Sequence, residues 1–141
     1  MNTTTLSMIL KIREWQEETE KQKFASLLSE RRRIEMYLRE IEERFQILSQ
    51  EKISASDLVA ENINVLCSEI EYLTDRRIKI RESLKALDEE IEKQRETYEE
   101  AFKERRKVEE LYYRAISEKK AEVEKNEEKV TYDILMSRYR S

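Results

Sequence analysis

Hydrophobic side chains recur at alternating spacings of three and four residues along most of the chain. One series, with Arg31 as its single polar member, is Phe24, Leu27, Arg31, Ile34, Leu38, Ile41, Phe45 and Leu48. A second, in which only Arg77, Gln94 and Arg105 are polar, is Ile63, Leu66, Ile70, Leu73, Arg77, Ile80, Leu84, Leu87, Ile91, Gln94, Tyr98, Ala101, Arg105, Val108 and Tyr112. Alternation of three and four is the a/d pattern of a coiled coil, so the sequence predicts two coiled-coil strands.

The heptad pattern breaks once, between Ser49 and Ser56, where serine, glutamine and alanine replace the dense charge of the flanks. Ser54, Ser56 and Asp57 can accept hydrogen bonds from the free amides of a new helix. We therefore predict one helix over residues 5–50, a turn over 51–57 and a second helix over 57–139. The expected fold is all-α, a single two-helix antiparallel coiled-coil hairpin over residues 1–141 with a longer second helix.

The heptads also suggest which residues face each other across the hairpin. A turn at residue 55 or 56 lets apolar residues meet in nearly every layer. The expected facing pairs are Leu48 with Ile63, Phe45 with Leu66, Ile41 with Ile70, Leu38 with Leu73, Leu27 with Leu84 and Phe24 with Leu87. Two seam arginines face isoleucines, Arg31 with Ile80 and Arg77 with Ile34, and their guanidinium groups reach water or acids such as Glu35 and Glu82.

The predicted helices differ in length by about 50 Å at 1.5 Å per residue. About thirty-five residues at the end of the second helix therefore lack a partner in the hairpin. They include apolar and aromatic residues from Val108 to Tyr139, and such a helix either frays or docks onto another protein. In the first helix Met8, Ile12 and Trp15 form an outward stripe, unless a local shift of register turns Trp15 inward.

Composition excludes most chemistry. The 141 residues are 43% charged and contain no glycine, proline or histidine, so phosphate loops and histidine-based catalysis or metal binding are absent. We expect no catalytic, cofactor or metal residue, and no enzyme. The net charge of −4 gives no general attraction for nucleic acid. The longest uncharged run, Met1 to Leu10, is too short to span a membrane, and the single Cys67 fits a reducing compartment. A cytoplasmic protein is expected.

A basic belt lies where the predicted hairpin gives way to the free end of the second helix. It consists of Lys103, Arg105, Arg106 and Lys107, with acids interleaved. Three interpretations remain open: a solvated face neutralised by salt bridges, a contact with an acidic protein partner, or a contact with lipid or nucleic acid.

The whole chain resembles the FliJ type of flagellar export stalk protein. The resemblance rests on the opening aliphatic run with Leu6, Ile9, Leu10, Ile12, Arg13 and Glu14, the heptad arm, the short polar turn, and the longer arm with its basic and aromatic end. It implies an antiparallel coiled coil that enters the hexameric ATPase ring of the type III export apparatus, also contacts the large export-gate subunit, and escorts export chaperones.

The resemblance implies two sets of contact residues. The ATPase ring would meet Leu6, Leu10, Arg13, Trp15, Arg105, Arg106, Leu111, Tyr112 and Tyr113. The export gate would meet Leu66, Ile70, Leu73 and Arg77. Association with the cytoplasmic face of the inner membrane would then occur through partners, without insertion into the membrane. Stalks of this kind also serve injection-type secretion systems, and the sequence does not distinguish the two.

Two other functions fit the same pattern. A holdase or chaperone escort of the export pathway would grip client proteins with the exposed aromatic residues of the free end. A structural spacer would dimerise through that same unpaired tail.

Overall fold

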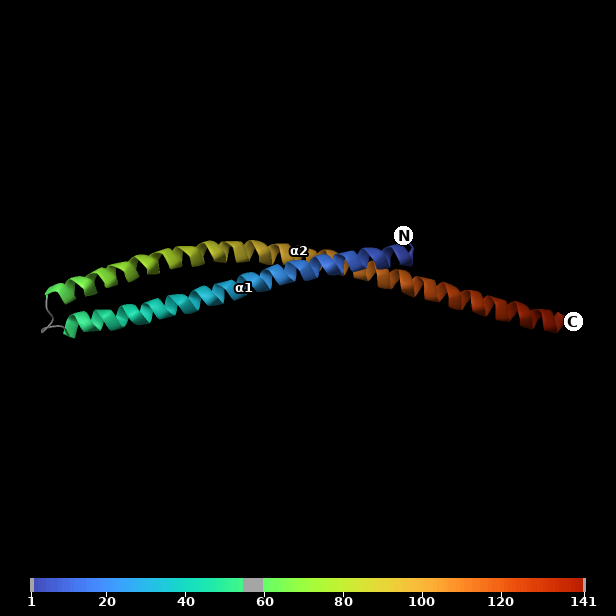
Figure 1. The fold of residues 1–141 in the computed structure, drawn as a ribbon. Coiled ribbons are helices and arrows are strands. Elements are labelled where there is room, and N and C mark those ends of the chain that lie inside the picture. Colours follow the sequence, from blue (N-terminus) through green and yellow to red (C-terminus); the bar gives the residue numbers. More distant parts are fainter. Residues whose placement is uncertain (1, 55–59, 141) are drawn as a thin grey trace. The chain divides into compact units, whose positions relative to one another are not determined.

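The computed structural model describes residues 2–54 and 60–140, which form two α-helices (Figure 1). Helix α1 spans Thr3–Ser54 and helix α2 spans Ala60–Arg140, with 52 and 81 residues. The described residues contain no strand. The predicted all-α hairpin with a longer second helix is therefore confirmed.

The helix ends differ slightly from the prediction. Helix α1 continues to Ser54, through the first part of the expected turn, and α2 is described from Ala60 rather than from residue 57. The expected capping residues Ser56 and Asp57 lie outside the described residues.

The start of α1 is fixed by a cap that the sequence analysis did not identify. The Thr5 amide donates a hydrogen bond to Asn2 Oδ1 at 2.7 Å, and the Leu6 amide donates to the Asn2 carbonyl at 3.1 Å. Asparagine is a favoured N-cap because its short side chain satisfies an amide that has no acceptor within the helix. At the end of α2, Arg138 and Arg140 lie in the last turn. Their positive charges stabilise the helix there, because the C-terminal end of a helix dipole carries a partial negative charge.

The chain divides into two compact units, each containing a piece of both helices. The turn-side unit comprises Lys21–Thr97, and the terminal unit comprises Met1–Glu20 with Tyr98–Ser141. In the turn-side unit the buried cluster consists of Ile41, Leu48, Leu66, Leu73 and Ile80. All five belong to the predicted heptad series, so the positions that form the core were identified correctly.

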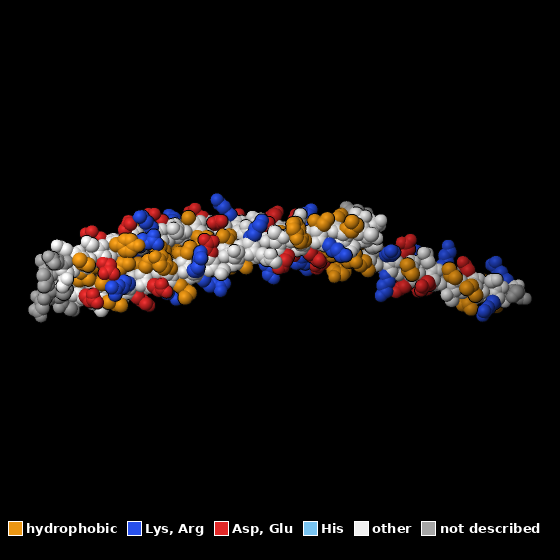
Figure 2. Space-filling model, in the orientation of Figure 1, with side chains coloured by type: hydrophobic (Ala, Val, Ile, Leu, Met, Phe, Trp, Pro, Cys, Tyr) orange, Lys and Arg blue, Asp and Glu red, His pale blue; other side chains and the backbone are white. Residues whose placement is uncertain are grey.

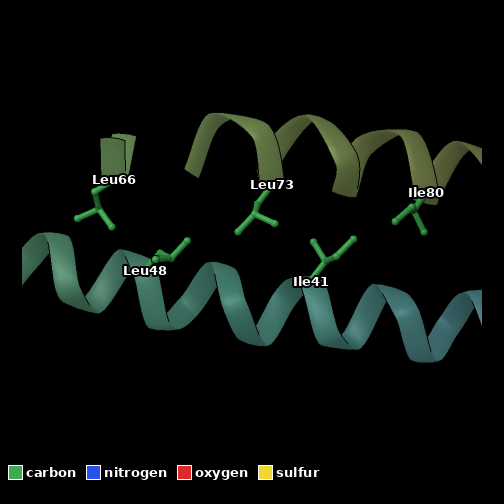
Figure 3. Packing of buried hydrophobic residues seen from close by; sticks show 5 residues of the cluster. All are labelled: Ile41, Leu48, Leu66, Leu73 and Ile80. Atoms are coloured by element: carbon green, nitrogen blue, oxygen red, sulfur yellow. The ribbon is translucent and has the colours of Figure 1, made fainter. Parts of the chain in front are cut away.

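The register of the turn-side unit differs from the predicted one. Leu48 lies between Leu66 and Leu73, and Ile41 lies between Leu73 and Ile80 (Figure 3). The prediction instead placed Leu48 opposite Ile63, and Ile41 opposite Ile70. The two helices are thus shifted by about seven residues, one heptad, relative to the expected pairing. A heptad pattern repeats after such a shift, so the apolar residues alone could not exclude it.

The two seam arginines, Arg31 and Arg77, contact residues other than those expected from the predicted register. The Arg77 guanidinium lies 4.5 Å from the centre of the Phe45 ring, where the sequence analysis had expected Ile34. Arg31 pairs with Glu35, as expected, but its second partner is Asp88 rather than Glu82. The hydrogen bond to Asp88 raises the pKa of Arg31 above its ordinary value.

The terminal unit has a thinner apolar seam. On α1, Leu6 and Leu10 are buried there. On α2 half-buried residues follow the same three-four spacing and end at Ala115: Tyr98, Ala101, Arg105, Val108, Tyr112 and Ala115. From Ile116 to Leu135 every residue is exposed, so α2 has a long free end, as expected (Figure 1).

Candidate partner-binding surfaces

The free end of α2 exposes hydrophobic side chains among charged ones (Figure 2). The exposed apolar and aromatic residues beyond the seam are Ile116, Val123, Val130, Tyr132, Ile134, Leu135 and Tyr139. Tyr132, Leu135 and Tyr139 are separated by three and four residues, which places them on one face of the helix. Tyr139 is 87% exposed. Three anchors at this spacing are typical of a helix that docks into an apolar groove of another protein.

Arg105 is the most heavily paired member of the basic belt. Its Nε donates to Glu17 Oε2 on α1 at 2.7 Å, and its Nη1 forms a second ion pair with Glu109. The Arg105 and Glu17 side chains are only 16% and 17% exposed, and the guanidinium also lies 5.0 Å from the Phe102 ring centre. The hydrogen bond to Glu17 raises the pKa of Arg105, although burial opposes the rise. Arg105 therefore holds α1 against α2 within the terminal unit.

Arg106 and Lys107 of the belt are paired with acids on the same helix. Arg106 pairs with Glu109 at 3.4 Å, and Lys107 pairs with Glu104 at 3.2 Å. These are exposed contacts between residues three apart, and each contributes little to stability. Of the three interpretations of the belt, the salt-bridged face agrees best with this arrangement.

All nine residues expected at an ATPase ring lie in the terminal unit, but their exposure differs widely. Exposed members are Trp15, at 68%, together with Arg106, Leu111 and Tyr113. Leu6 and Leu10 are buried in the seam, while Arg13, Arg105 and Tyr112 are half-buried. The exposure of Trp15 agrees with an outward stripe and not with the inward alternative.

An open groove of about 810 Å³ lies beside these residues, where the first turns of α1 run along α2. Its apolar lining comes from Met8 on α1 and from Tyr112, Ile116 and Val123 on α2. Lysines and glutamates line the rest of the groove: Lys11, Lys119, Lys120, Glu124 and Glu127. The groove is therefore an apolar trough with charges of both signs along its length.

The four residues expected at the export gate belong to the seam of the turn-side unit. Leu66 and Leu73 are buried, Ile70 packs against the cluster that contains them, and Arg77 covers Phe45. Residues that hold the two helices together are not available to a partner while the hairpin is closed.

An exposed face lies next to that seam and was missed by the sequence analysis. Arg76 Nη2 donates to Tyr37 Oη at 3.2 Å, and Arg44 pairs with Glu69 at 3.3 Å, so these four residues mark one side of the seam. Exposed apolar residues on the same helix stripes as those four complete the face: Ile47, Val65 and Tyr72. We call this surface the lateral face. The three-to-four spacing of Val65, Glu69, Tyr72 and Arg76 was its signal in the sequence.

No group of three or more potential ligands among His, Cys, Asp and Glu could hold a metal ion within the described residues. Over the same part of the chain, no helix combines the length and the apolar character that crossing a membrane requires. Cys67 is half-buried beside the seam, as a small filler would be.

Comparison with known proteins gives the family. The model of the flagellar FliJ protein family matches residues 1–141, the whole chain. The chain belongs to the FliJ family. No curated protein and no solved structure matches it.

Membership of the FliJ family confirms the resemblance and assigns the chain a role in flagellar export. It also gives the helical hairpin a context, because the family consists of export components and is not a known enzyme family.

Proposed function

We propose that this FliJ-family chain is the non-enzymatic central stalk of the flagellar type III export ATPase complex. Its terminal unit enters the ATPase hexamer, promotes ring assembly and hydrolysis, and connects the ring to the export gate. The observation that carries the proposal is the free end of α2, where every residue from Ile116 to Leu135 is exposed although hydrophobic side chains recur along it. Exposed apolar surface of this kind on a soluble protein usually marks a binding site for another protein.

The anchors for the ring are the exposed aromatic and aliphatic side chains rather than the whole set expected from the resemblance. Tyr132, Leu135 and Tyr139 share one helical face, and Trp15 stands exposed on α1. Tryptophan and tyrosine supply much of the energy of protein interfaces because they bury a large area at a small entropy cost. Leu6 and Leu10 act indirectly, by holding the start of α1 against α2.

The contact with the export gate is made by the lateral face instead of the buried seam residues beneath it. Tyr37 and Tyr72 present exposed rings there, and Arg76 links the two helices beside them. Arg76 lies 5.8 Å from the Tyr37 ring centre and is already held in place. A surface fixed before binding loses less entropy on docking.

The experiment uses the purified chain, the cognate ATPase and the soluble part of the gate subunit. Replacing Tyr132, Leu135 and Tyr139 together by alanine removes the anchors of the free end. ATP hydrolysis and ring assembly should lose their dependence on the chain, while binding to the gate persists. Tyr72→Ala should give the opposite pattern. If the triple variant stimulates the ATPase as well as the native chain does, the stalk proposal fails.

A matched control uses the polar residues of the same free end. Glu128→Ala and Thr131→Ala change exposed positions between Val123 and Tyr132 without removing an apolar anchor. This double variant should stimulate the ATPase normally, and loss of stimulation would point to a general defect of the helix rather than to the anchors.

A second function, holdase or chaperone escort, is favoured by the open groove of the terminal unit. Met8, Ile116 and Val123 could cover one side of an extended apolar client segment there. Suppression of client aggregation by the chain alone, abolished by Met8→Glu, would support it. A spacer that dimerises through the tail would instead show a mass that rises with concentration in light scattering. In each case the working location is the cytoplasm, at the inner membrane through partners.

A further inference from the structure

The hairpin satisfies its heptad pattern in two registers. In the register of the structure, Leu48 lies between Leu66 and Leu73. In a register shifted by seven residues, Leu48 faces Ile63, and apolar residues again meet across nearly every layer of the seam. The apolar core therefore does not by itself select one pairing, and the polar contacts across the seam must do so.

Those contacts favour the register of the structure. Four ion pairs cross between the helices: Arg31 with Asp88, Arg44 with Glu69, Glu42 with Arg81, and Glu17 with Arg105. All four are broken by the shift, because each α1 residue then lies beside the α2 residue seven positions earlier. Arg31 would come to lie beside Arg81, and Arg44 beside Asn62. One of these contacts would be a repulsion between like charges, and the other would join a charge to a neutral amide.

We propose that the hairpin is a two-register device, in which the charge pairs across the seam hold the described register and their loss lets α1 slide along α2 by one heptad. The slide lengthens the free end of α2 by about 10 Å at 1.5 Å per residue. In the terminal unit Leu6 and Leu10 keep seam positions, whereas Val108 and Tyr112 are left closer to the new edge of the seam. Shifts of one helix past another are an established way for helical proteins to switch.

Two pairs of introduced cysteines distinguish the registers. Arg44→Cys combined with Glu69→Cys reports the described register, and we call its disulfide the described-register bridge. Arg44→Cys combined with Asn62→Cys reports the shifted register, and we call its disulfide the shifted-register bridge. Both pairs are placed in a chain with Cys67→Ser. The two α2 positions are about 10 Å apart along the helix. A disulfide requires Cα atoms within about 7 Å, so one register cannot close both bridges.

Arg31→Glu is the variant that should move the equilibrium. In both registers the new carboxylate lies one turn from Glu35 on the same helix. In the described register it also faces Asp88, and in the shifted register it faces Arg81 instead. The yield of the shifted-register bridge relative to the described-register bridge should rise by about tenfold. Arg33→Glu makes the same charge change at an exposed position with an outward side chain and should leave the ratio unchanged. Adding Asp88→Arg to Arg31→Glu should restore the native ratio.

Three outcomes would overturn the proposal. The shifted-register bridge could fail to form in any variant while the chain stays helical by circular dichroism. Arg33→Glu could shift the ratio as far as Arg31→Glu does. Finally, Arg31→Glu could lose helicity and both bridges, which would mean that the charge pairs hold the hairpin together rather than choose its register.

Discussion

Leu48 and Ile47 are neighbours in sequence but have opposite environments. Leu48 is 2% exposed in the core of the turn-side unit, whereas Ile47 is 48% exposed. Replacing Leu48 by alanine removes three buried carbons and leaves a space beside Leu66 and Leu73 that the narrow seam can only partly close. The expected cost is about 2–3 kcal/mol of the free energy of unfolding, at the lower end of the range for buried leucines, because solvent lies close to the seam.

Urea denaturation followed by circular dichroism measures this cost. With a slope of about 2 kcal/mol per molar urea, Leu48→Ala should lower the midpoint by about 1–1.5 M. Ile47→Ala should leave the midpoint nearly unchanged, because alanine is the better helix former and little buried area is lost. An equal loss of stability in the two variants would refute the assignment of Leu48 to the seam and of Ile47 to the surface.

Three smaller predictions follow from individual contacts. Glu17→Gln should cost about 1–2 kcal/mol of unfolding free energy, because Arg105 keeps its partner Glu109 but loses the ion pair across the helices; hydrogen exchange at the start of α1 should become faster. Asn2→Ala should cost about 1 kcal/mol and increase exchange at the Thr5 amide, which loses its acceptor. Arg95 lowers the pKa of Glu92 through a hydrogen bond, so the pair stabilises α2 above the ordinary pKa of a glutamate and is lost as the pH falls through the lowered value. In Arg95→Gln the pKa of Glu92, followed by NMR, should return toward its ordinary value.

The heptad pattern predicted the helices and the seam positions well. Ile41, Leu48, Leu66, Leu73 and Ile80 are buried as expected, because burial depends on which helical face a residue occupies. Helical faces follow directly from spacing along one strand. The seam could therefore be predicted without knowledge of the partner strand.

The pairing of the two strands could not be predicted in the same way. A shift of seven residues returns every a and d residue to an equivalent position, so hydrophobicity does not distinguish the two pairings. Charged pairs such as Arg31 and Asp88 make the difference, and the reach of the long arginine side chain depends on rotamers that spacing does not fix. For the same reason the prediction assigned Arg77 to Ile34 and missed its position over Phe45.

The residues that contact a partner were difficult to predict for a related reason. A motif at helical spacing can lie on the seam or one residue to its side, and the two differ by about 100° around the helix. Ile70 and Leu73 fall on the buried side, while Tyr72 between them is exposed. Only the three-dimensional pairing shows which of two adjacent stripes is free to bind.

The buried cluster of the turn-side unit is a single row of side chains, and this has a consequence for how the hairpin comes apart. Each layer packs only against the layer before it and the layer after it. Opening should therefore proceed layer by layer, and amide exchange should be slowest near Ile41 and Leu73 and faster at the layers farther from them. If force were applied to one end of such a protein, the two helices would separate over a series of small free-energy barriers instead of one large barrier.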